Sequence, residues 1–147
     1  MTEFRHAGIV VQDLERSLHF YCDLLGLKVL RAMEEEGAYL DNMLGMKGVR
    51  VTTVKLTGDQ GGAGLELLYF HAPRTPVAPV RGLVELGPSH VAFTVADLDA
   101  TFARLTAAGV QFNAPPQLAP DGLAKVTFCR DPDGTPIELV EMLEVSC

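Results

Sequence analysis

The feature that most constrains this chain is an internal repeat. Residues 6–18 (HAGIVVQDLERSL) align without a gap over residues 90–102 (HVAFTVADLDATF), an offset of 84 residues. In both copies a histidine and a β-branched, apolar run predict a strand, and an aspartate then opens an apolar-periodic segment that predicts a helix. A second match sets LELL at 65–68 over IELV at 137–140. The chain is therefore expected to fold as two related halves.

Each half is predicted to have the element order β-α-β-β-β. The two helices are expected to end at Gly26 and Gly109, because glycine readily adopts the left-handed conformation that ends helices. The further strands are expected at residues 28–32, 49–57 and 65–70 in the first half, and at 111–114, 125–129 and 137–142 in the second.

The second half is shorter by 12 residues, and the difference is assigned to residues 32–48, expected to form a loop with a short helix. The proline-rich residues 72–88 read as a connector. We therefore expect a single domain, 1–147, with module one at about 4–71 and module two at about 89–144.

Composition narrows the class of protein. A chain of 147 residues with 48% hydrophobic and 21% charged residues is typical of one ordinary folded domain. No apolar run is long enough to cross a membrane, and the N-terminus lacks the pattern of a signal peptide, so a cytoplasmic location is expected. The formal charge of −7 argues against nucleic acid as a partner. Cys22, Cys129 and Cys147 are too few and too far apart for a disulfide framework, and we expect them to be reduced.

Four residues carry the candidate chemistry. Each half begins with a histidine, His6 or His90, and places a glutamate, Glu66 or Glu138, inside its last strand. Glutamate is depleted in strands and is seldom buried without a partner. One such residue alone is more often a surface or packing residue, but recurrence at equivalent positions favours a shared role. If the halves pair about an approximate twofold axis, the four side chains can converge on one divalent cation.

Other features favour ordinary structural roles. His19 and His71 have no counterpart in the other half and are expected not to bind metal. The glycine-rich residues 58–64 lack the ending of a phosphate-binding loop and are interpreted as a hairpin turn. The acidic residues 34–36 are expected on a solvated face or in a loop. No serine or cysteine has the surroundings of a catalytic nucleophile.

Three segments resemble the vicinal oxygen chelate superfamily over nearly the whole chain. They are HAGIVVQDLERSLHFYCDLLGL from His6, HVAFTVADLD from His90 and DPDGTPIELVE from Asp131. That superfamily includes glyoxalase I, methylmalonyl-CoA epimerase, extradiol dioxygenases, and the fosfomycin and bleomycin resistance proteins. The resemblance implies an α+β fold in which two tandem βαβββ modules form a cupped mixed sheet around a metal site. It also implies the ligand set His6, Glu66, His90 and Glu138.

This ligand set is most similar to that of glyoxalase I. Bleomycin-binding members generally lack the metal residues, extradiol dioxygenases and fosfomycin-modifying members use three protein ligands, and the epimerase usually has glutamine in place of Glu66. The arginine pattern that binds glutathione is not evident, and Arg31, Arg50 and Arg74 are the candidates to replace it. Whether the substrate carries glutathione or CoA stays open.

The expected function is that of a metal-dependent lyase or isomerase of the glyoxalase type. It would chelate a small-molecule substrate through two neighbouring oxygens and shift a proton through an enediolate, with Glu138 as the base and Glu66 on the opposite side. The alternatives are a methylmalonyl-CoA-type epimerase, an Fe(II) ring-cleaving dioxygenase and a binding protein without turnover.

The cofactor expected is a divalent ion, and its ligands would accept Zn, Ni, Co, Mn or Fe. The resemblance also implies a homodimer. In some relatives the modules of two chains exchange, so the four ligands could come from one chain or from two.

Overall fold

The computed structural model describes residues 1–62 and 64–144, and the chain divides into two compact units at the boundary between Ala78 and Pro79. This boundary lies within the proline-rich residues 72–88. Ala63, within the predicted hairpin turn, and Cys147, one of the three cysteines predicted to be reduced, lie outside the described residues.

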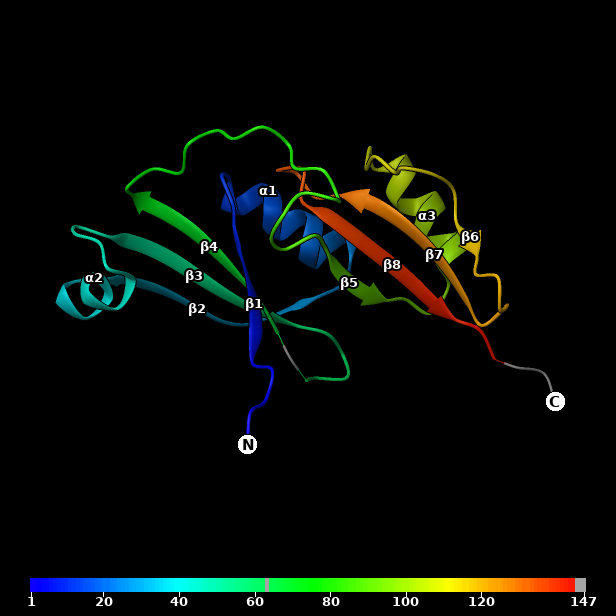
Figure 1. Cartoon of the computed structure of the whole chain (residues 1–147), viewed down its shortest axis with the longest axis horizontal. Helices are drawn as coiled ribbons and strands as arrows, with labels where there is room; N and C mark the ends of the chain where they lie inside the picture. Colours follow the sequence, from blue (N-terminus) through cyan, green and yellow to red (C-terminus); the bar gives the residue numbers. More distant parts are fainter. Residues whose placement is uncertain (63, 145–147) are drawn as a thin grey trace. The chain divides into compact units, whose positions relative to one another are not determined.

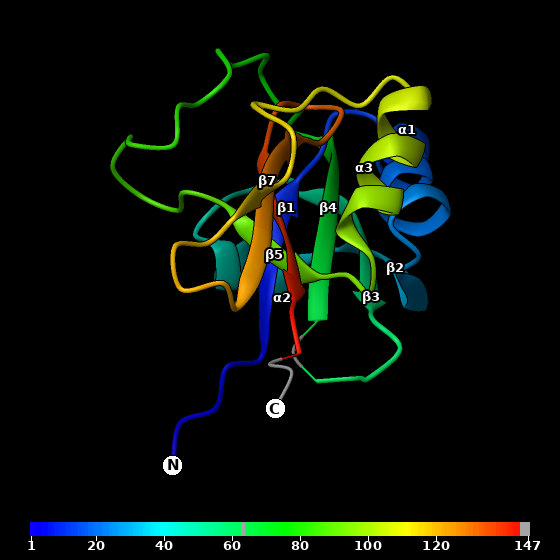
Figure 2. The same ribbon diagram turned by 90° about the vertical axis from the view of Figure 1, so that its right-hand side faces the viewer.

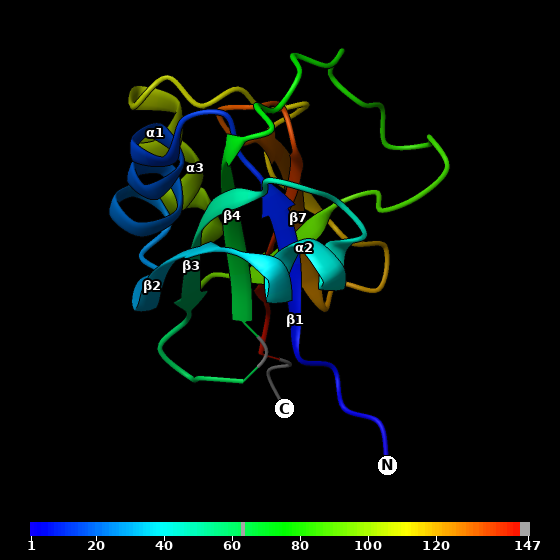
Figure 3. The ribbon, with the colours of Figure 1, turned by 90° about the vertical axis from the view of Figure 1, so that its left-hand side faces the viewer.

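The first unit contains a four-stranded mixed sheet with the order β1-β4-β3-β2. Strand β1 pairs with β4 in parallel, and the other neighbours are antiparallel. Figure 3 shows these strands side by side in that order, with helix α2 placed after β2. The elements are β1 (His6–Val10), α1 (Leu14–Leu18), the π-helix η1 (His19–Leu24), β2 (Lys28–Glu36), α2 (Ala38–Leu44), β3 (Arg50–Thr57) and β4 (Gly64–Ala72) (Figure 1).

The second unit repeats this topology with a sheet of order β5-β8-β7-β6, in which β5 and β8 are again the parallel pair. Helix α3 lies along one face of the sheet (Figure 2), where the Leu98 amide donates to Glu141 Oε2 at 2.7 Å. The two units therefore share the β-α-β-β-β order predicted from the repeat. The elements are β5 (Val91–Thr94), α3 (Leu98–Ala107), β6 (Gln117–Leu118), β7 (Ala124–Arg130) and β8 (Pro136–Met142).

The predicted helix boundaries are confirmed. Asp13 and Asp97 cap α1 and α3 by accepting hydrogen bonds from the amides of Arg16 and Ala100, at 3.0 and 2.9 Å. Gly109, just after α3, has a φ of +88°, which a residue with a side chain adopts only at a cost.

The prediction of one continuous α-helix before Gly26 is wrong in its geometry. After Leu18 the chain continues as η1, and the Leu25 amide donates to the Phe20 carbonyl at 3.0 Å in the i to i+5 pattern of a π-helix. Consecutive Phe20 and Tyr21 are both buried and meet edge to face. The apolar spacing could not separate the two helix types, because both bury one face of the segment.

The strand predicted at 111–114 is also wrong. Only an isolated bridge joins Phe112 to Cys129, and the short strand β6 forms farther along the chain. Pro115 and Pro116 lack the N–H groups that a regular ladder needs, which explains the interruption.

In the first unit, β2 extends beyond the predicted residue 32 and includes Glu34, Glu35 and Glu36, each paired with a residue of β3. The short helix expected within 32–48 is present as α2. Because β2 is at the edge of the sheet, these acidic residues can remain in a strand while reaching solvent.

In the central strands of each sheet, the most deeply buried residues lie on one face. In β3 and β4 this face carries Leu56 and Leu67, and in β8 it carries Ile137 and Leu139, all of them fully buried. The glutamates of β4 and β8 alternate with these residues and therefore belong to the other face. Leu40 of α2 packs on that other face of the first sheet, in a cluster with Val49, Val51, Leu68 and Phe70.

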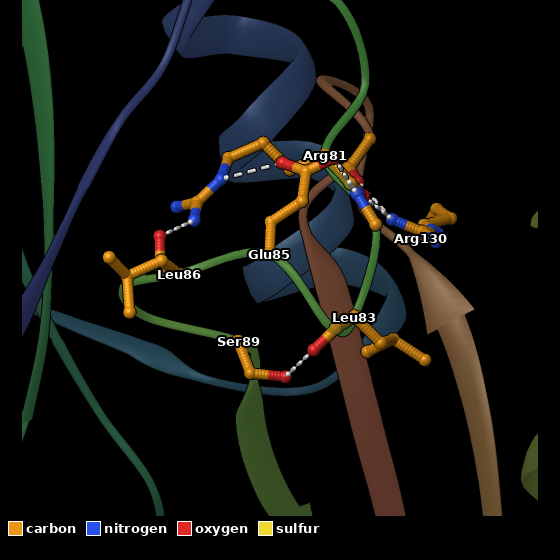
Figure 4. A network of polar contacts seen from close by, with 8 residues as sticks. Arg81, Leu83, Glu85, Leu86, Ser89 and Arg130 are labelled. Carbon is orange, nitrogen blue, oxygen red and sulfur yellow. Dashed lines mark hydrogen bonds and ion pairs between the residues drawn. The ribbon is translucent and has the colours of Figure 1, made fainter.

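Polar contacts hold the segment that leads into β5. The Arg81 guanidinium pairs with Glu85 at 3.4 Å and donates to the Leu86 carbonyl at 2.7 Å (Figure 4). Arg130 of β7 donates to the Arg81 carbonyl at 2.9 Å, and the Ser89 hydroxyl donates to the Leu83 carbonyl at 2.9 Å. This part of the proline-rich stretch is therefore fixed within the second unit.

Candidate metal centre

The first unit brings His6 and Glu66 together. Parallel pairing places His6 beside Gly64 and Gly8 beside Glu66, so His6 and Glu66 are on the same face, two residues apart in register. His6 Nε2 lies 3.7 Å from Glu66 Oε2, and the glutamate side chain is only 15% exposed. Gly64 is needed for this register, because a Cβ there would lie 2.8 Å from the Leu56 carbonyl oxygen.

The second unit brings His90 and Glu138 together in the same way. His90 directly precedes β5, and Glu138 is the second residue on from Pro136 in β8, where it pairs with Ala92. His90 Nε2 lies 2.9 Å from Glu138 Oε2, and the two side chains are 35% and 23% exposed. The equivalent pairs thus have the same construction, although the atoms are closer in the second.

Ser89 orients the imidazole of His90. The single hydroxyl proton of Ser89 is donated to the Leu83 carbonyl, so Ser89 Oγ accepts from the His90 Nδ1–H at 3.0 Å. With Nδ1 protonated, the Nε2 atom of a neutral imidazole presents its lone pair to the Glu138 carboxylate. Two acceptors that face each other at this distance need a proton or a cation between them.

Different side chains lie beside the two glutamates. Lys55 of β3 is the direct partner of Glu66, and its Nζ atom lies 3.9 Å from Glu66 Oε2. At the equivalent place in the second unit, Phe128 of β7 is paired with Glu138 and its ring meets the His90 ring edge to face. One carboxylate therefore has a cationic neighbour and the other an aromatic one.

The donor atoms fit a divalent cation. Each unit supplies one imidazole nitrogen and one carboxylate oxygen that face each other, and such mixed ligands suit Zn, Ni, Co, Mn or Fe. Among residues 1–62 and 64–144, no three or more His, Cys, Asp or Glu side chains gather into a metal-binding group. The structure thus shows two His–Glu pairs, and the shared four-ligand site stays a prediction.

His19 and His71 have other contacts. His19 Nδ1 lies 2.8 Å from Asp23 Oδ2 one helical turn away. His71 Nε2 lies 2.7 Å from the Thr52 hydroxyl of β3 and 3.4 Å from Glu34 of β2. The expectation that neither binds the predicted metal remains a prediction.

The cysteines give no sign of catalysis. Cys22 and Cys129 are free thiols, as predicted. Burial raises the pKa of the Cys129 thiol to about 12, with a further contribution from Asp131, so this thiol is protonated at neutral pH.

Sequence reasoning missed Lys55 and Ser89. The position of Lys55 beside Glu66 depends on the register of β3 against β4, which the glycine-rich turn does not reveal. Ser89 directly precedes His90, so its proximity was visible, but the Leu83 carbonyl that fixes its hydroxyl was not.

No helix in the described part of the chain is long and apolar enough to cross a membrane.

Comparison with solved structures identifies the fold family. A glyoxalase family protein of Bacillus cereus superposes with a TM-score of 0.85 and 26% identity, covering 98% of this chain and 96% of that one. The α+β architecture, with one four-stranded mixed sheet in each unit, is therefore the glyoxalase-like fold predicted from the sequence.

Comparison with other protein sequences agrees with the structural comparison. The lactoylglutathione lyase of Pseudomonas aeruginosa is 30% identical over 155 residues, covering 94% of this chain and 81% of the relative. The uncharacterized protein YaeR of Escherichia coli is 31% identical, covering 96% and 97%. The family model for the Glyoxalase/Bleomycin resistance protein/Dioxygenase superfamily matches residues 3–139. With this match over most of its length, the chain belongs to that superfamily.

Proposed function

We propose that this protein is a metal-dependent lyase or isomerase of the glyoxalase type. The observation that carries the proposal is the repeated geometry in which His6 and Glu66, and again His90 and Glu138, direct a nitrogen and a carboxylate oxygen at each other. The relative named lactoylglutathione lyase supports the reaction class. The four donors would form one site, within one chain or between the two chains of a homodimer.

The substrate would be a small molecule with two neighbouring oxygens, such as a hemithioacetal or a hydroxy-ketone. A bound divalent cation supplies Lewis-acid stabilisation of the negative charge that develops on those oxygens when the adjacent C–H bond loses its proton. His6 and His90 hold nitrogen lone pairs toward the site, and Ser89 keeps the Nε2 atom of His90 in that orientation.

Glu138 is the proposed base. Its carboxylate faces the Nε2 atom of His90 and has Phe128 as its cross-strand neighbour, so an apolar ring lies on one side of it. Glu66 Oε2 also faces the Lys55 ammonium, which competes with a substrate proton for the same oxygen. Glu66 is therefore assigned to binding, and Glu138 to moving the proton.

The test combines metal analysis, a substrate screen and one isosteric substitution. Purified protein is expected to contain a divalent metal and to turn over one of a panel of hemithioacetals. Glu138→Gln should lower kcat by at least about 100-fold, the usual contribution of a general base. The matched control is Glu141→Gln, three residues on in β8, whose amide oxygen can still accept from the Leu98 amide.

The other possible results of these experiments would each favour a different role for Glu138 or a different function. Full activity of Glu138→Gln would remove this residue from the role of base. Turnover of acyl-CoA epimers instead of hemithioacetals would favour the epimerase, and oxygen uptake on catechols with Fe(II) would favour the dioxygenase. Metal binding without turnover of any panel member would leave a binding protein.

A further inference from the structure

A row of charged side chains crosses the first sheet beside the His6–Glu66 pair. Arg31 of β2 is the direct partner of Lys55, and Lys55 is the direct partner of Glu66. Residues directly opposite one another in antiparallel strands have side chains on the same face. Arg31, Lys55, Glu66 and His6 therefore share the face that carries the proposed metal ligands.

This row contains more positive charge than its neighbours neutralise. Lys55 Nζ reaches only the edge of ion-pair distance, 3.9 Å from Glu66 Oε2, and its side chain is 40% exposed. Arg31 is exposed, and no ion pair joins it to a residue in the described parts of the chain. Like charges directly opposite across two strands are unfavourable. An anion would relieve that repulsion.

The second unit shows that the fold does not require a lysine here. At the matching register position Phe128 lies opposite Glu138 and packs against His90. The amide of the nearby Asn113 donates to the Phe128 carbonyl, where the first unit has the pairing of Lys55 with Arg31. The sheet accepts an aromatic residue at the position of Lys55. The positive charges of the first unit are therefore not needed to form the sheet, and we look for their role in binding.

We infer that Lys55, assisted by Arg31, binds an anionic oxygen group, a carboxylate or a phosphate, that the substrate carries next to its chelating oxygens. The inference rests on the proposed function, because it places that group beside the cation that Glu66 would help to hold. A cation held by Glu66 would repel the Lys55 ammonium and so leave it available for the substrate. On the same face, Leu68 and Phe70 of β4 are only half-buried and supply apolar surface next to Glu66, so an acidic compound with a short apolar part is the substrate class that fits.

The test uses three hydroxamates, which chelate divalent metals through two adjacent oxygens. Malonic monohydroxamate carries a carboxylate, its primary amide has nearly the same shape without the charge, and phosphonoacetohydroxamate carries a phosphonate. Binding to the metal-loaded full chain is measured by titration calorimetry. At least one charged probe is expected to bind about tenfold more tightly than the amide, the scale of one charge-assisted hydrogen bond at an exposed site.

Three variants assign that preference to Lys55. Lys55→Met keeps the apolar stem and should lose most of the preference for the charged probes, whereas Lys55→Arg should retain it. Lys125→Met is the control, because it removes one positive charge from β7, where Lys125 pairs with Asp99. The metal affinity of Lys55→Met, titrated without any probe, should equal or exceed that of the native protein, because a repelling charge is removed.

The outcomes separate the two proposals. Equal binding of all probes by the native protein overturns the inference and leaves the proposed function standing. A loss of affinity for every probe alike in Lys55→Met also overturns it, because the lysine would then act only through Glu66. If no hydroxamate binds the metal-loaded protein, the proposed chelating function fails, and the inference fails with it.

Discussion

The two units have the same strands in the same order, yet their His–Glu pairs have different surroundings. In the first unit His6 and Glu66 are 3.7 Å apart, with Lys55 beside the carboxylate. In the second unit the corresponding atoms of His90 and Glu138 are 2.9 Å apart, and Ser89 Oγ accepts a hydrogen bond from the other ring nitrogen of His90. Equivalent topology therefore preserves the positions of the pairs, while the neighbouring side chains have diverged. Under the proposed function, the first half would bind a charged group of the substrate and the second would act on its proton.

The largest effect is expected from substitutions in the buried cores of the two units. They test whether both units contribute equally to the free energy of unfolding. Leu67 and Leu139 each follow the glutamate of their strand and are fully buried. Truncation of either to alanine should lower the free energy of unfolding by about 2–5 kcal/mol, because each leaves a cavity. Denaturant unfolding measures the change, and Leu118→Ala in the exposed strand β6 is the control. A negligible effect of one of the two core substitutions would show that its unit contributes little to stability.

A smaller effect is expected from the hydrogen bond between Ser89 and His90, the histidine of the second pair. Ser89→Ala removes the acceptor for the Nδ1–H of His90 and should weaken metal binding by about tenfold, as is usual for a group that orients a metal-binding histidine. Competition with a chelator of known affinity measures the change. Ser89→Thr keeps a hydroxyl and should restore most of the affinity. An unchanged affinity in Ser89→Ala would mean that the packing of Phe128 alone orients the ring.

The smallest effect concerns the thiols, Cys22 in the first unit and Cys129 in the second. Burial raises the pKa of both, with Asp23 contributing at Cys22, and it raises that of Cys129 to about 12. Because the thiolate is the reactive form, Cys129 should be labelled more slowly than Cys22 at pH 8 by a thiol reagent. Raising the pH toward 9 should accelerate both reactions without reversing their order. Peptide mapping by mass spectrometry distinguishes the sites, and faster labelling of Cys129 would contradict this assignment.

The repeat allowed most of the architecture to be predicted. Two copies of the same pattern gave the β-α-β-β-β order, and the capping aspartates Asp13 and Asp97 located both helix starts. The errors fell where local sequence does not discriminate. The π-helical turn after Leu18 buries the same kind of apolar face as an α-helix, and Pro115 and Pro116 blocked a strand that the apolar residues before them suggested.

The sequence by itself determined which residues could carry the chemistry, because recurrence of His6 with Glu66 and of His90 with Glu138 distinguishes them from isolated polar residues. Only the tertiary structure decided what surrounds each pair. Hydrogen-bond register between strands brings together residues that are distant or unremarkable in the sequence, so Lys55 reaches Glu66 and Phe128 reaches His90 only after the sheets form. A period of two specifies the face of a strand, but it does not specify the neighbour across the ladder.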